Sequence, residues 1–264
     1  MKKYIKKILN KKTQKIIKVL IYYTMHYGWY DYILNCKKDV SNKEKVSIII
    51  PSHSNTKYVR ESVMSALNQT HKNTEILIMT DVPEYGIEKE LSGLLDKVKL
   101  FTEPNLKRAD KTNTLTERAT GDFIVLLCDD DILDKNFINN TLSILKSKKV
   151  DIVYTDVKLI GDSNGYSLAK AWKKTNFLQT TPVYITALCK KSVYKDTGGF
   201  DKNLYSYGDW DFWWTAYDMG FKAYHLKQPL FHYRIHSGQD TNTVDAARAK
   251  KEIRDKHLNK KYTR

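Results

Sequence analysis

The stretch Phe123-Ile-Val-Leu-Leu-Cys-Asp-Asp-Asp131 decides the fold class of this chain. Five apolar residues, Phe123 to Leu127, run together, and three consecutive aspartates end the stretch. A short, continuous apolar run is typical of a strand that is buried on both faces, as in a parallel sheet. Ligands of open α/β sheets bind outside the carboxyl ends of the strands. We therefore expect the three carboxylates at the edge of a binding site.

These neighbouring carboxylates, Asp129, Asp130 and Asp131, repel one another and need a local counter-charge. A divalent cation would supply it, because Mg²⁺ and Mn²⁺ favour carboxylate oxygens and substrate phosphates. The alternative is a polar turn in which Asp131 or Asp134 only caps the next helix. Taken alone, the acidic triplet leaves both interpretations open.

Apolar runs and helical periodicities before this stretch alternate in a β-α-β-α-β order. That order predicts an α/β fold with a doubly wound, mostly parallel sheet flanked by helices. The expected strands are Val46–Pro51, Glu75–Asp81, Val98–Phe101 and the run before Cys128. Helices are expected around Val59–Leu67, Ile87–Leu95 and Ala109–Ala119.

The chain after Asp131 predicts a smaller antiparallel part near the C-terminal end. The expected helices are Phe137–Leu145 and Gly208–Met219, with a turn at Gly198–Asp201. The expected extended segments are Asp151–Asp156, Val183–Leu188, Phe221–His225 and Leu230–Ile235. Residues 158–181 show little periodicity and are predicted to form a long functional loop.

Composition limits the class of protein. The chain has 264 residues and is 41% hydrophobic, so it can bury a substantial core. Its three cysteines, Cys36, Cys128 and Cys189, are widely spaced and form no CxxC pair. This argues against a disulfide framework or a zinc site and suits a reducing cytosol.

The net charge of +15 is confined to the two ends. Residues 1–45 hold 12 Lys and 3 acidic residues, and residues 246–264 hold 8 basic and 2 acidic residues. The middle of the chain is neutral. We therefore divide the chain into a basic N-terminal segment, 1–44, a catalytic domain, 45–240, and a basic C-terminal tail, 241–264. Basic ends on a neutral body predict an anionic partner surface.

The N-terminal segment predicts a basic amphipathic helix, because lysines and apolar residues interleave at helical spacing. Lys18 interrupts the apolar region and no small-residue cleavage site follows, unlike a secretory signal. No run approaches the roughly 18 apolar residues of a spanning helix. We expect the helix to lie on the inner, cytoplasmic face of an anionic membrane, with the aromatic residues of 22–30 at the headgroups. The alternative is an ordinary helix that packs on the domain.

Six segments of the chain form an ordered set between residues 46 and 240. They are Val46-Ser-Ile-Ile-Ile-Pro51, Ser65-Ala-Leu-Asn-Gln-Thr70, Glu75-Ile-Leu-Ile-Met-Thr-Asp81, Cys128-Asp-Asp-Asp131 with Ile132-Leu133, Gly198-Gly-Phe-Asp201 followed by Gly208-Asp-Trp-Asp211, and Tyr233-Arg-Ile-His236. The set resembles family 2 glycosyltransferases of the GT-A fold. The resemblance implies transfer of a sugar from a nucleotide-diphosphate donor to a hydroxyl, with inversion at the anomeric carbon.

The resemblance also implies roles for the acidic residues. Asp130 would contact a divalent metal, Mn²⁺ or Mg²⁺, and Asp129 the ribose or a metal-bound water. Asp131 would assist the metal or cap a helix. Asp209 would be the base that removes the acceptor proton, at a helix start where the dipole stabilises its charge. A plain helix cap is the alternative for Asp209, and Asp211 competes for the catalytic role.

The remaining implied residues bind the nucleotide or support the metal. Asp81 would accept a hydrogen bond from the base, Lys111 would steady the base or phosphate, and Arg234 would contact phosphate. The pocket would be lined by Pro51, Ser52 and His53. His236 would be a late metal ligand, although a lone histidine is more often structural. For Lys111 the alternative is a solvated helix lysine.

Four positions depart from the family pattern. Thr80 stands where a second acid is common beside Asp81, and Cys128 takes the first acidic position of the metal motif. Gly208 replaces a glutamate, and Thr112 sits where an arginine is frequent. These departures leave the base of the nucleotide and the division of labour among the carboxylates open.

We predict a metal-dependent inverting glycosyltransferase that uses a UDP-sugar. The acceptor would be a glycan or a lipid-linked glycan in bacterial surface polysaccharide synthesis, and no nucleic acid partner is expected. One alternative is a nucleotidyltransferase, which would need a glycine-rich loop where the chain has Ser52-His-Ser-Asn-Thr56. Another is a non-catalytic binder of an anionic polymer or membrane, whose affinity would fall with salt.

Overall fold

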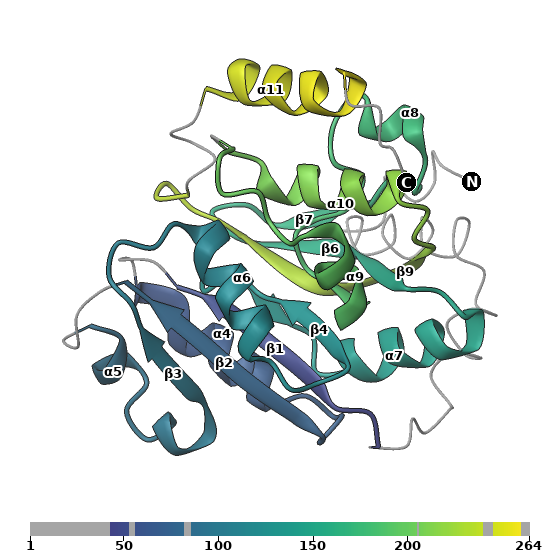
Figure 1. Cartoon of the computed structure of the whole chain (residues 1–264). Coiled ribbons are helices and arrows are strands. Elements are labelled where there is room, and N and C mark those ends of the chain that lie inside the picture. Colours follow the sequence, from purple (N-terminus) through teal and green to yellow (C-terminus); the bar gives the residue numbers. More distant parts are fainter. Residues whose placement is uncertain (1–42, 53–55, 82–85, 205, 240–244, 260–264) are drawn as a thin grey trace, which may run out of the picture. The chain divides into compact units, whose positions relative to one another are not determined.

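The computed structural model describes residues 43–52, 56–81, 86–204, 206–239 and 245–259 (Figure 1). The predicted N-terminal helix and His53 lie outside the described residues. The strands are β1 Val46–Pro51, β2 Thr74–Thr80, β3 Lys99–Thr102, β4 Phe123–Leu126, β5 Ile132–Leu133, β6 Ile152–Gly161, β7 Gly165–Ser167, β8 Ala187–Lys190 and β9 Ala223–Ile235. The helices are α4 Val59–Leu67, α5 Ile87–Glu90, α6 Arg108–Arg118, α7 Phe137–Lys148, α8 Lys174–Phe177, α9 Lys191–Thr197, α10 Gly208–Asp218 and α11 Ala246–Asn259, with short 3₁₀ turns at Thr56–Tyr58 and Leu95–Lys97.

The described strands form one sheet in the order β3-β2-β1-β4-β8-β6-β9-β5, and β7 pairs with β6. The first four strands are parallel, as the alternating pattern predicted. The α/β fold class is therefore confirmed. The antiparallel part is larger than expected, because β8 enters the middle of the sheet antiparallel to both β4 and β6.

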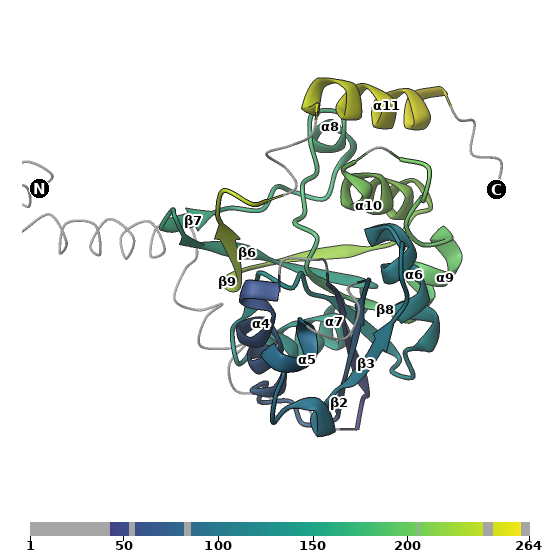
Figure 2. The same ribbon diagram turned by 90° about the vertical axis from the view of Figure 1, so that its left-hand side faces the viewer.

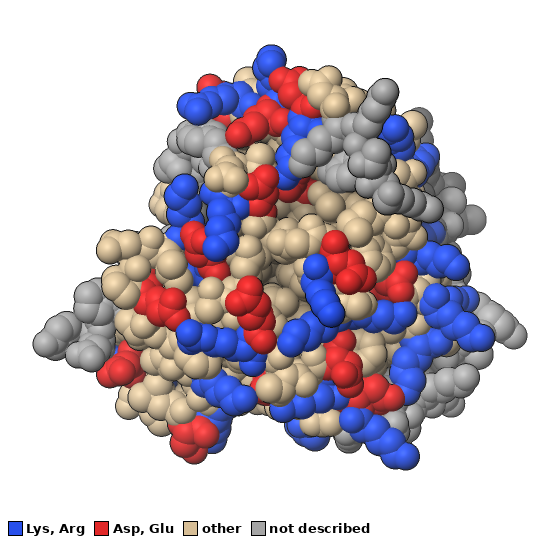
Figure 3. Space-filling view, viewed as in Figure 1, with Lys and Arg blue, Asp and Glu red and all other residues tan. Residues whose placement is uncertain are grey.

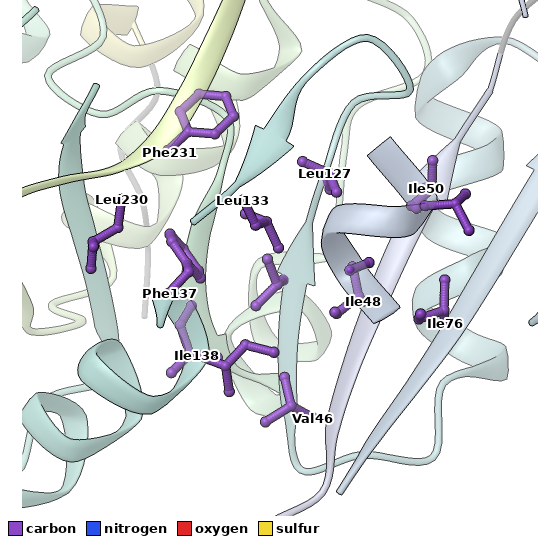
Figure 4. Close-up of a cluster of buried hydrophobic side chains, with 14 of the residues drawn as sticks. Val46, Ile48, Ile50, Ile76, Leu127, Leu133, Phe137, Ile138, Leu230 and Phe231 are labelled. Carbon is purple, nitrogen blue, oxygen red and sulfur yellow. The ribbon is translucent and has the colours of Figure 1, made fainter. Parts of the chain in front are cut away.

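The strands β1, β2 and β4 are buried on both faces, which explains their largely apolar runs, while β3 at the edge of the sheet is only partly buried. Ile48 and Ile50 face one hydrophobic cluster, and Ile49 faces the other. Figure 4 shows the first cluster, which extends from Ile48 and Ile50 on β1 past Leu127 to Leu133 and Phe137. The first cluster also contains α4 and α7 side chains, and the second contains those of α6 and α10. Helices therefore cover both faces of the sheet.

The long loop predicted over residues 158–181 is partly wrong. β6 continues to Gly161 and pairs with β7 as a hairpin, and α8 lies further on. Gly161 turns the chain at φ +84, where an added Cβ would come within 2.4 Å of the Ile235 carbonyl oxygen. The turn of this hairpin depends on the close approach of the Gly161 backbone to that of Ile235. Such an approach leaves no alternating pattern in the sequence from which the hairpin could be predicted.

The two predicted closing strands are one strand, β9. Its register against β6 shifts between Thr155 and Val157, so the residues around Pro229 are accommodated as an irregularity. Bulges of this kind let a strand continue past residues that cannot pair. The helix expected over Ile87–Leu95 is also shorter than predicted, because α5 ends at Glu90.

Most of the C-terminal segment expected as a tail is a helix in the structure. Ala249, Ile253 and His257 recur every four residues and are buried along one face of α11. Figures 1 and 2 show α11 lying over α10, on the side of α10 that faces away from the sheet. In the part of the chain with described coordinates, each helix is too short or too polar to cross a membrane.

Candidate active site

The candidate site lies at the carboxyl ends of three neighbouring strands. Ser52 follows β1, Asp81 follows β2, and Cys128 to Asp131 follow β4. Parallel strands end at the same edge of a sheet, so these side chains meet although they lie far apart in the sequence. The predicted sites after these strands are therefore brought to one place.

The residues predicted to bind the nucleotide form a connected group. Ser52 Oγ donates a 2.7 Å hydrogen bond to Asp129 Oδ2. Lys111 Nζ donates to the Ser52 carbonyl oxygen at 2.7 Å and lies 2.8 Å from Asp81 Oδ1. Lys111 is fully buried, so the alternative of a solvated helix lysine is wrong. Its ammonium instead joins the ends of β1 and β2.

The predicted metal residues also gather at this edge. His236 Nε2 lies 3.0 Å from Asp130 Oδ2. Ligand atoms of Cys128, Asp130 and Asp131 all lie within 4.8 Å of one another. Burial raises the pKa of the Cys128 thiol well above its usual value, so this cysteine stays protonated in the free protein. Cys128 therefore contributes no negative charge to the cluster.

Asp131 is fully buried and only half satisfied. Its Oδ1 accepts a 2.8 Å hydrogen bond from the backbone N–H of Arg234, while none of the described groups donates to its Oδ2. Burial, together with the negative charge of Asp130, raises the pKa of Asp131 well above its usual value. Neither Asp131 nor Asp134 caps α7, whose N-cap is Asn136; Asp134 Oδ1 accepts a hydrogen bond from the Asn136 backbone N–H in the turn before the helix. A buried carboxylate oxygen without a donor fits a cation site.

Arg234 braces the motif from β9. Its Nε donates to the Asp130 carbonyl oxygen at 2.7 Å, and its Nη2 donates to Glu61 Oε2 at 2.7 Å. The guanidinium also lies 4.3 Å from the ring centroid of Tyr58. These contacts fix the acidic loop against α4 and β9. The phosphate contact implied for Arg234 stays a prediction.

The two rival aspartates on α10 have different surroundings. Burial raises the pKa of Asp209 to about 6, against the opposing effects of its backbone hydrogen bonds and of the positive charge of Arg108. Asp211 is buried against α11, where Lys256 and His257 bind both of its oxygens. Asp211 is therefore held in a protein network, and the environment of Asp209 is the one expected of a general base.

Arg108, at the start of α6, is a residue that the sequence reasoning missed. Its positive charge opposes the rise in pKa of Cys128, Asp131 and Asp209, so it acts electrostatically on both the acidic motif and α10. The signal was present, because Arg108 lies one helical turn before Thr112, the position where the family often has arginine. Arg108 thus links the two halves of the candidate site.

Comparison with protein families gives a match over more than half of the chain. The sequence model described as glycosyl transferase family 2 matches residues 47–195, which is more than half of the chain. The match includes the strands β1, β2 and β4 and the acidic motif that follows β4.

Curated relatives carry the same kind of name. An uncharacterized glycosyltransferase of Rickettsia typhi is 29% identical over 213 residues, covering 75% of this chain and 66% of the relative. One of Methanocaldococcus jannaschii is 28% identical, covering 74% of this chain and 72% of the relative. Among the five Rickettsia relatives the chain spans about one third to just under two thirds of their length.

Solved structures share the fold. Staphylococcus aureus TarS 1-349 in complex with UDP-GlcNAc has a TM-score of 0.67 at 16% identity, covering 83% of this chain and 68% of TarS 1-349. The mannosyltransferase PcManGT of Pyrobaculum calidifontis, in complex with GDP-Man and Mn²⁺, has a TM-score of 0.63 at 16% identity, covering 96% and 75%. These likenesses confirm the predicted GT-A fold.

Proposed function

The chain belongs to glycosyl transferase family 2, and we propose that it transfers a sugar from a nucleoside-diphosphate donor to a hydroxyl group of a glycan or lipid-linked acceptor. We propose a UDP-sugar as donor and inversion at the anomeric carbon. The observation that carries the proposal is the meeting of Asp130, Asp131 and His236 beside the Lys111–Asp81 pair. Arg108 acts electrostatically on both this group and Asp209.

The donor nucleotide would lie over the ends of β1 and β2. Asp81 presents a carboxylate to the N–H groups of the base, and Lys111 holds that carboxylate in place. Ser52 fixes Asp129, whose carboxylate would face the ribose. The nucleoside would thus be recognised by side chains whose positions are already fixed by other groups of the protein.

A divalent cation fits the acidic motif. Asp131 Oδ2 is buried and receives no hydrogen bond from the described residues, and Asp130 lies beside it. Asp130, Asp131 and His236 would hold the ion. When bound, Mn²⁺ or Mg²⁺ would neutralise the negative charge that the leaving nucleoside diphosphate gains. Arg234 keeps the loop of Asp130 in position by binding its carbonyl oxygen.

Asp209 would accept the proton of the attacking hydroxyl. With its pKa raised to about 6, it is mostly ionised at pH 7 and is a stronger base than an exposed aspartate. In an inverting transfer the base acts on the face of the sugar opposite the leaving group. Asp209 is only partly exposed, and these surroundings raise its basicity.

Related proteins support the donor class. TarS was solved with UDP-GlcNAc, and PcManGT with GDP-Man and Mn²⁺. Each ligand is a nucleoside diphosphate joined to a sugar. These ligands support a nucleotide-sugar donor for this chain, while our choice of uridine remains part of the proposal.

The two rival functions have less support. A nucleotidyltransferase would need a glycine-rich loop after the first strand, and Ser52-His-Ser-Asn-Thr56 has no glycine. A binder of anionic polymer would present a basic surface. Figure 3 shows basic and acidic residues interspersed on the face that carries α6 and α9. That face does not have the single-sign patch expected of a polyanion site.

Calorimetry with UDP and Mn²⁺ tests the proposal. UDP should bind the wild-type protein more tightly when Mn²⁺ is present, and Asp130→Asn should abolish this difference because it removes one charge from the cation site. Asp96→Asn, an exposed substitution away from the motif, is the matched control. Equal UDP binding by wild type and Asp130→Asn in Mn²⁺ would contradict the proposed site.

The cellular setting is a separate part of the proposal. The basic residues of 1–44 would hold the enzyme on the cytoplasmic, anionic face of a membrane, where a lipid-linked acceptor is available. A variant lacking residues 1–44 should leave the membrane fraction while keeping its UDP binding. Unchanged recovery with membranes would reject this attachment.

A further inference from the structure

The first turn of α10 carries two aspartates that face different surroundings. Asp209 is the proposed base, and Asp211 is 2% exposed and turned toward α11. Residues two apart on a helix lie on nearly opposite sides. Whatever holds Asp211 therefore also sets the position of the turn that carries Asp209.

A single ammonium group holds both ends of the segment that includes this turn. Lys256 Nζ, on α11, donates to Asp201 Oδ2 and to Asp211 Oδ2, each at 2.7 Å. Asp201 lies before α10 and Asp211 lies in its first turn. The same cation therefore binds both ends of the segment 201–211. Within the segment Tyr207 has φ 57, a left-handed conformation that costs energy and persists only where the surroundings hold it.

His257 holds the other side of Asp211. Its Nε2 lies 2.9 Å from Asp211 Oδ1 and its Nδ1 lies 3.2 Å from Asp218 Oδ2, with the ring stacked 4.4 Å from Trp214. Burial opposes the charged form, but the hydrogen bonds to Asp211 and Asp218 raise the pKa of His257 above its usual value. Lys256 is the neighbouring charge on its own helix. Each carboxylate oxygen of Asp211 thus has a hydrogen-bond partner on α11, Lys256 for Oδ2 and His257 for Oδ1.

The helix α11 is itself anchored beyond this network. Arg254 Nε and Nη2 donate to the carbonyl oxygens of Leu178 and Gln179 at 3.0 and 3.2 Å. Its guanidinium lies 5.7 Å from the ring centroid of Trp210, the residue between the two aspartates. These contacts, together with those of Lys256 and His257, make α11 a fixed support for α10.

We propose that Lys256 and His257 are positioning residues for the sugar transfer, acting through Asp211 to fix the turn of α10 that presents Asp209. This inference rests on the proposed function, because it assigns Asp209 as the base. The residues of the C-terminal helix would touch neither donor nor acceptor. Their effect would be on the placement of the base and on the exclusion of water around it.

Hydrogen–deuterium exchange on the full chain tests the positioning directly. Lys256→Met removes the cation that joins Asp201 to Asp211, so backbone exchange in residues 201–211 should become faster. Lys256→Arg keeps a cation with several donors and should restore slow exchange. Lys251→Met, which breaks the exposed Lys251–Asp255 pair on the same helix, is the matched control and should leave the segment unchanged. Unchanged exchange in Lys256→Met would overturn the proposal.

Kinetics with UDP-GlcNAc and with GDP-mannose give a second readout. For the donor that the wild type consumes, Lys256→Met should lower kcat about 10- to 100-fold with little change in donor KM, since a small displacement of a catalytic group has an effect of this size. The acidic limb of kcat, which we expect near pH 6 in the wild type, should move to lower pH as Asp209 becomes more solvated. Lys256→Arg should recover both values.

The outcomes separate this inference from the proposed function. Faster exchange with unchanged kcat and an unmoved acidic limb would make α11 a structural support only and overturn the positioning role. If the wild type consumes neither donor, the exchange result decides whether Lys256 fixes residues 201–211, and calorimetry with UDP and Mn²⁺ decides the proposed function separately.

Discussion

Buried carboxylates at the two ends of the parallel strands differ in their hydrogen bonding and in the direction of their pKa shifts. At the amino-terminal end, Glu75 accepts hydrogen bonds from Ser47 Oγ at 2.6 Å, from the Thr120 backbone N–H at 2.6 Å and from Lys99 Nζ at 2.8 Å. Burial opposes its charge, but these donors outweigh burial and lower the pKa of Glu75 to about 2. The Glu75 carboxylate is therefore ionised, well supplied with hydrogen-bond donors and structural in role.

At the carboxyl-terminal end, Asp131 has one backbone donor and an oxygen to which no described group donates. Burial and the nearby Asp130 raise its pKa, in the direction opposite to that of Glu75. Both residues belong to the same sheet region, and the difference lies in their partners. The incomplete hydrogen bonding of Asp131 leaves an oxygen that can bind a cation. It also lowers the stability of the protein without the cation.

The largest expected effect comes from removing the base at the carboxyl-terminal side. Asp209→Asn should lower kcat by about 10³-fold, because the amide cannot accept the proton of the acceptor hydroxyl. Donor binding, measured by calorimetry with UDP and Mn²⁺, should stay close to that of the wild type. Turnover within a few-fold of the wild type would show that another group removes the proton.

A smaller effect, on stability, is expected at the amino-terminal end. Glu75→Gln should lower the free energy of unfolding by about 3 kcal/mol at pH 7, since the pKa of Glu75 falls from 4.5 to about 2 on folding. A lowered pKa stabilises the fold above pH 4.5 and loses this effect as the pH falls toward 2. Urea denaturation at several pH values measures it, with the exposed Glu88→Gln as control. A pH-independent difference would contradict the assignment.

The smallest effect on stability, with the opposite sign, is expected for Asp131→Asn in metal-free protein. A raised pKa means that the wild type loses stability as the pH rises above the unfolded value near 3.8. The substitution should remove this loss and stabilise the protein by on the order of 1 kcal/mol at pH 7. Thermal denaturation measures the change, and Mn²⁺ should stabilise only the wild type. Strong destabilisation by Asp131→Asn would mean that the carboxylate is structural, like Glu75.

Much of the fold could be predicted because burial on both faces leaves a plain signal. Val46–Pro51 is apolar apart from Ser47, Phe123–Leu127 is a continuous apolar run, and they form β1 and β4 as expected. The insertion of β8 between β4 and β6 could not be predicted, because a strand of four residues carries too little pattern to choose its neighbours. The continuity of β9 could not be predicted, because Pro229 interrupts the strand pattern in the sequence. The irregularity that accommodates Pro229 is visible only in the pairing of β9 with β6.

Some residues of the candidate site could also be predicted from the sequence, and others could not. Asp129, Asp130 and Asp131 were recognisable because they are consecutive and follow a buried strand. Arg108 was missed because the family pattern pointed to the position of Thr112, one helical turn further along. The partners of Asp211 were missed too, since Lys256 lies 45 residues further along the chain.

The sequence by itself determined the parallel strands, the acidic motif after β4 and the family, because each depends on neighbouring residues whose spacing is visible in one dimension. Tertiary structure alone decided which carboxylates are satisfied and which are left with a raised pKa. It also decided that the basic C-terminal segment would include a helix that binds Asp211. The physical reason is that a carboxylate's charge state depends on the donors and burial around it, and folding brings those groups together from distant parts of the chain.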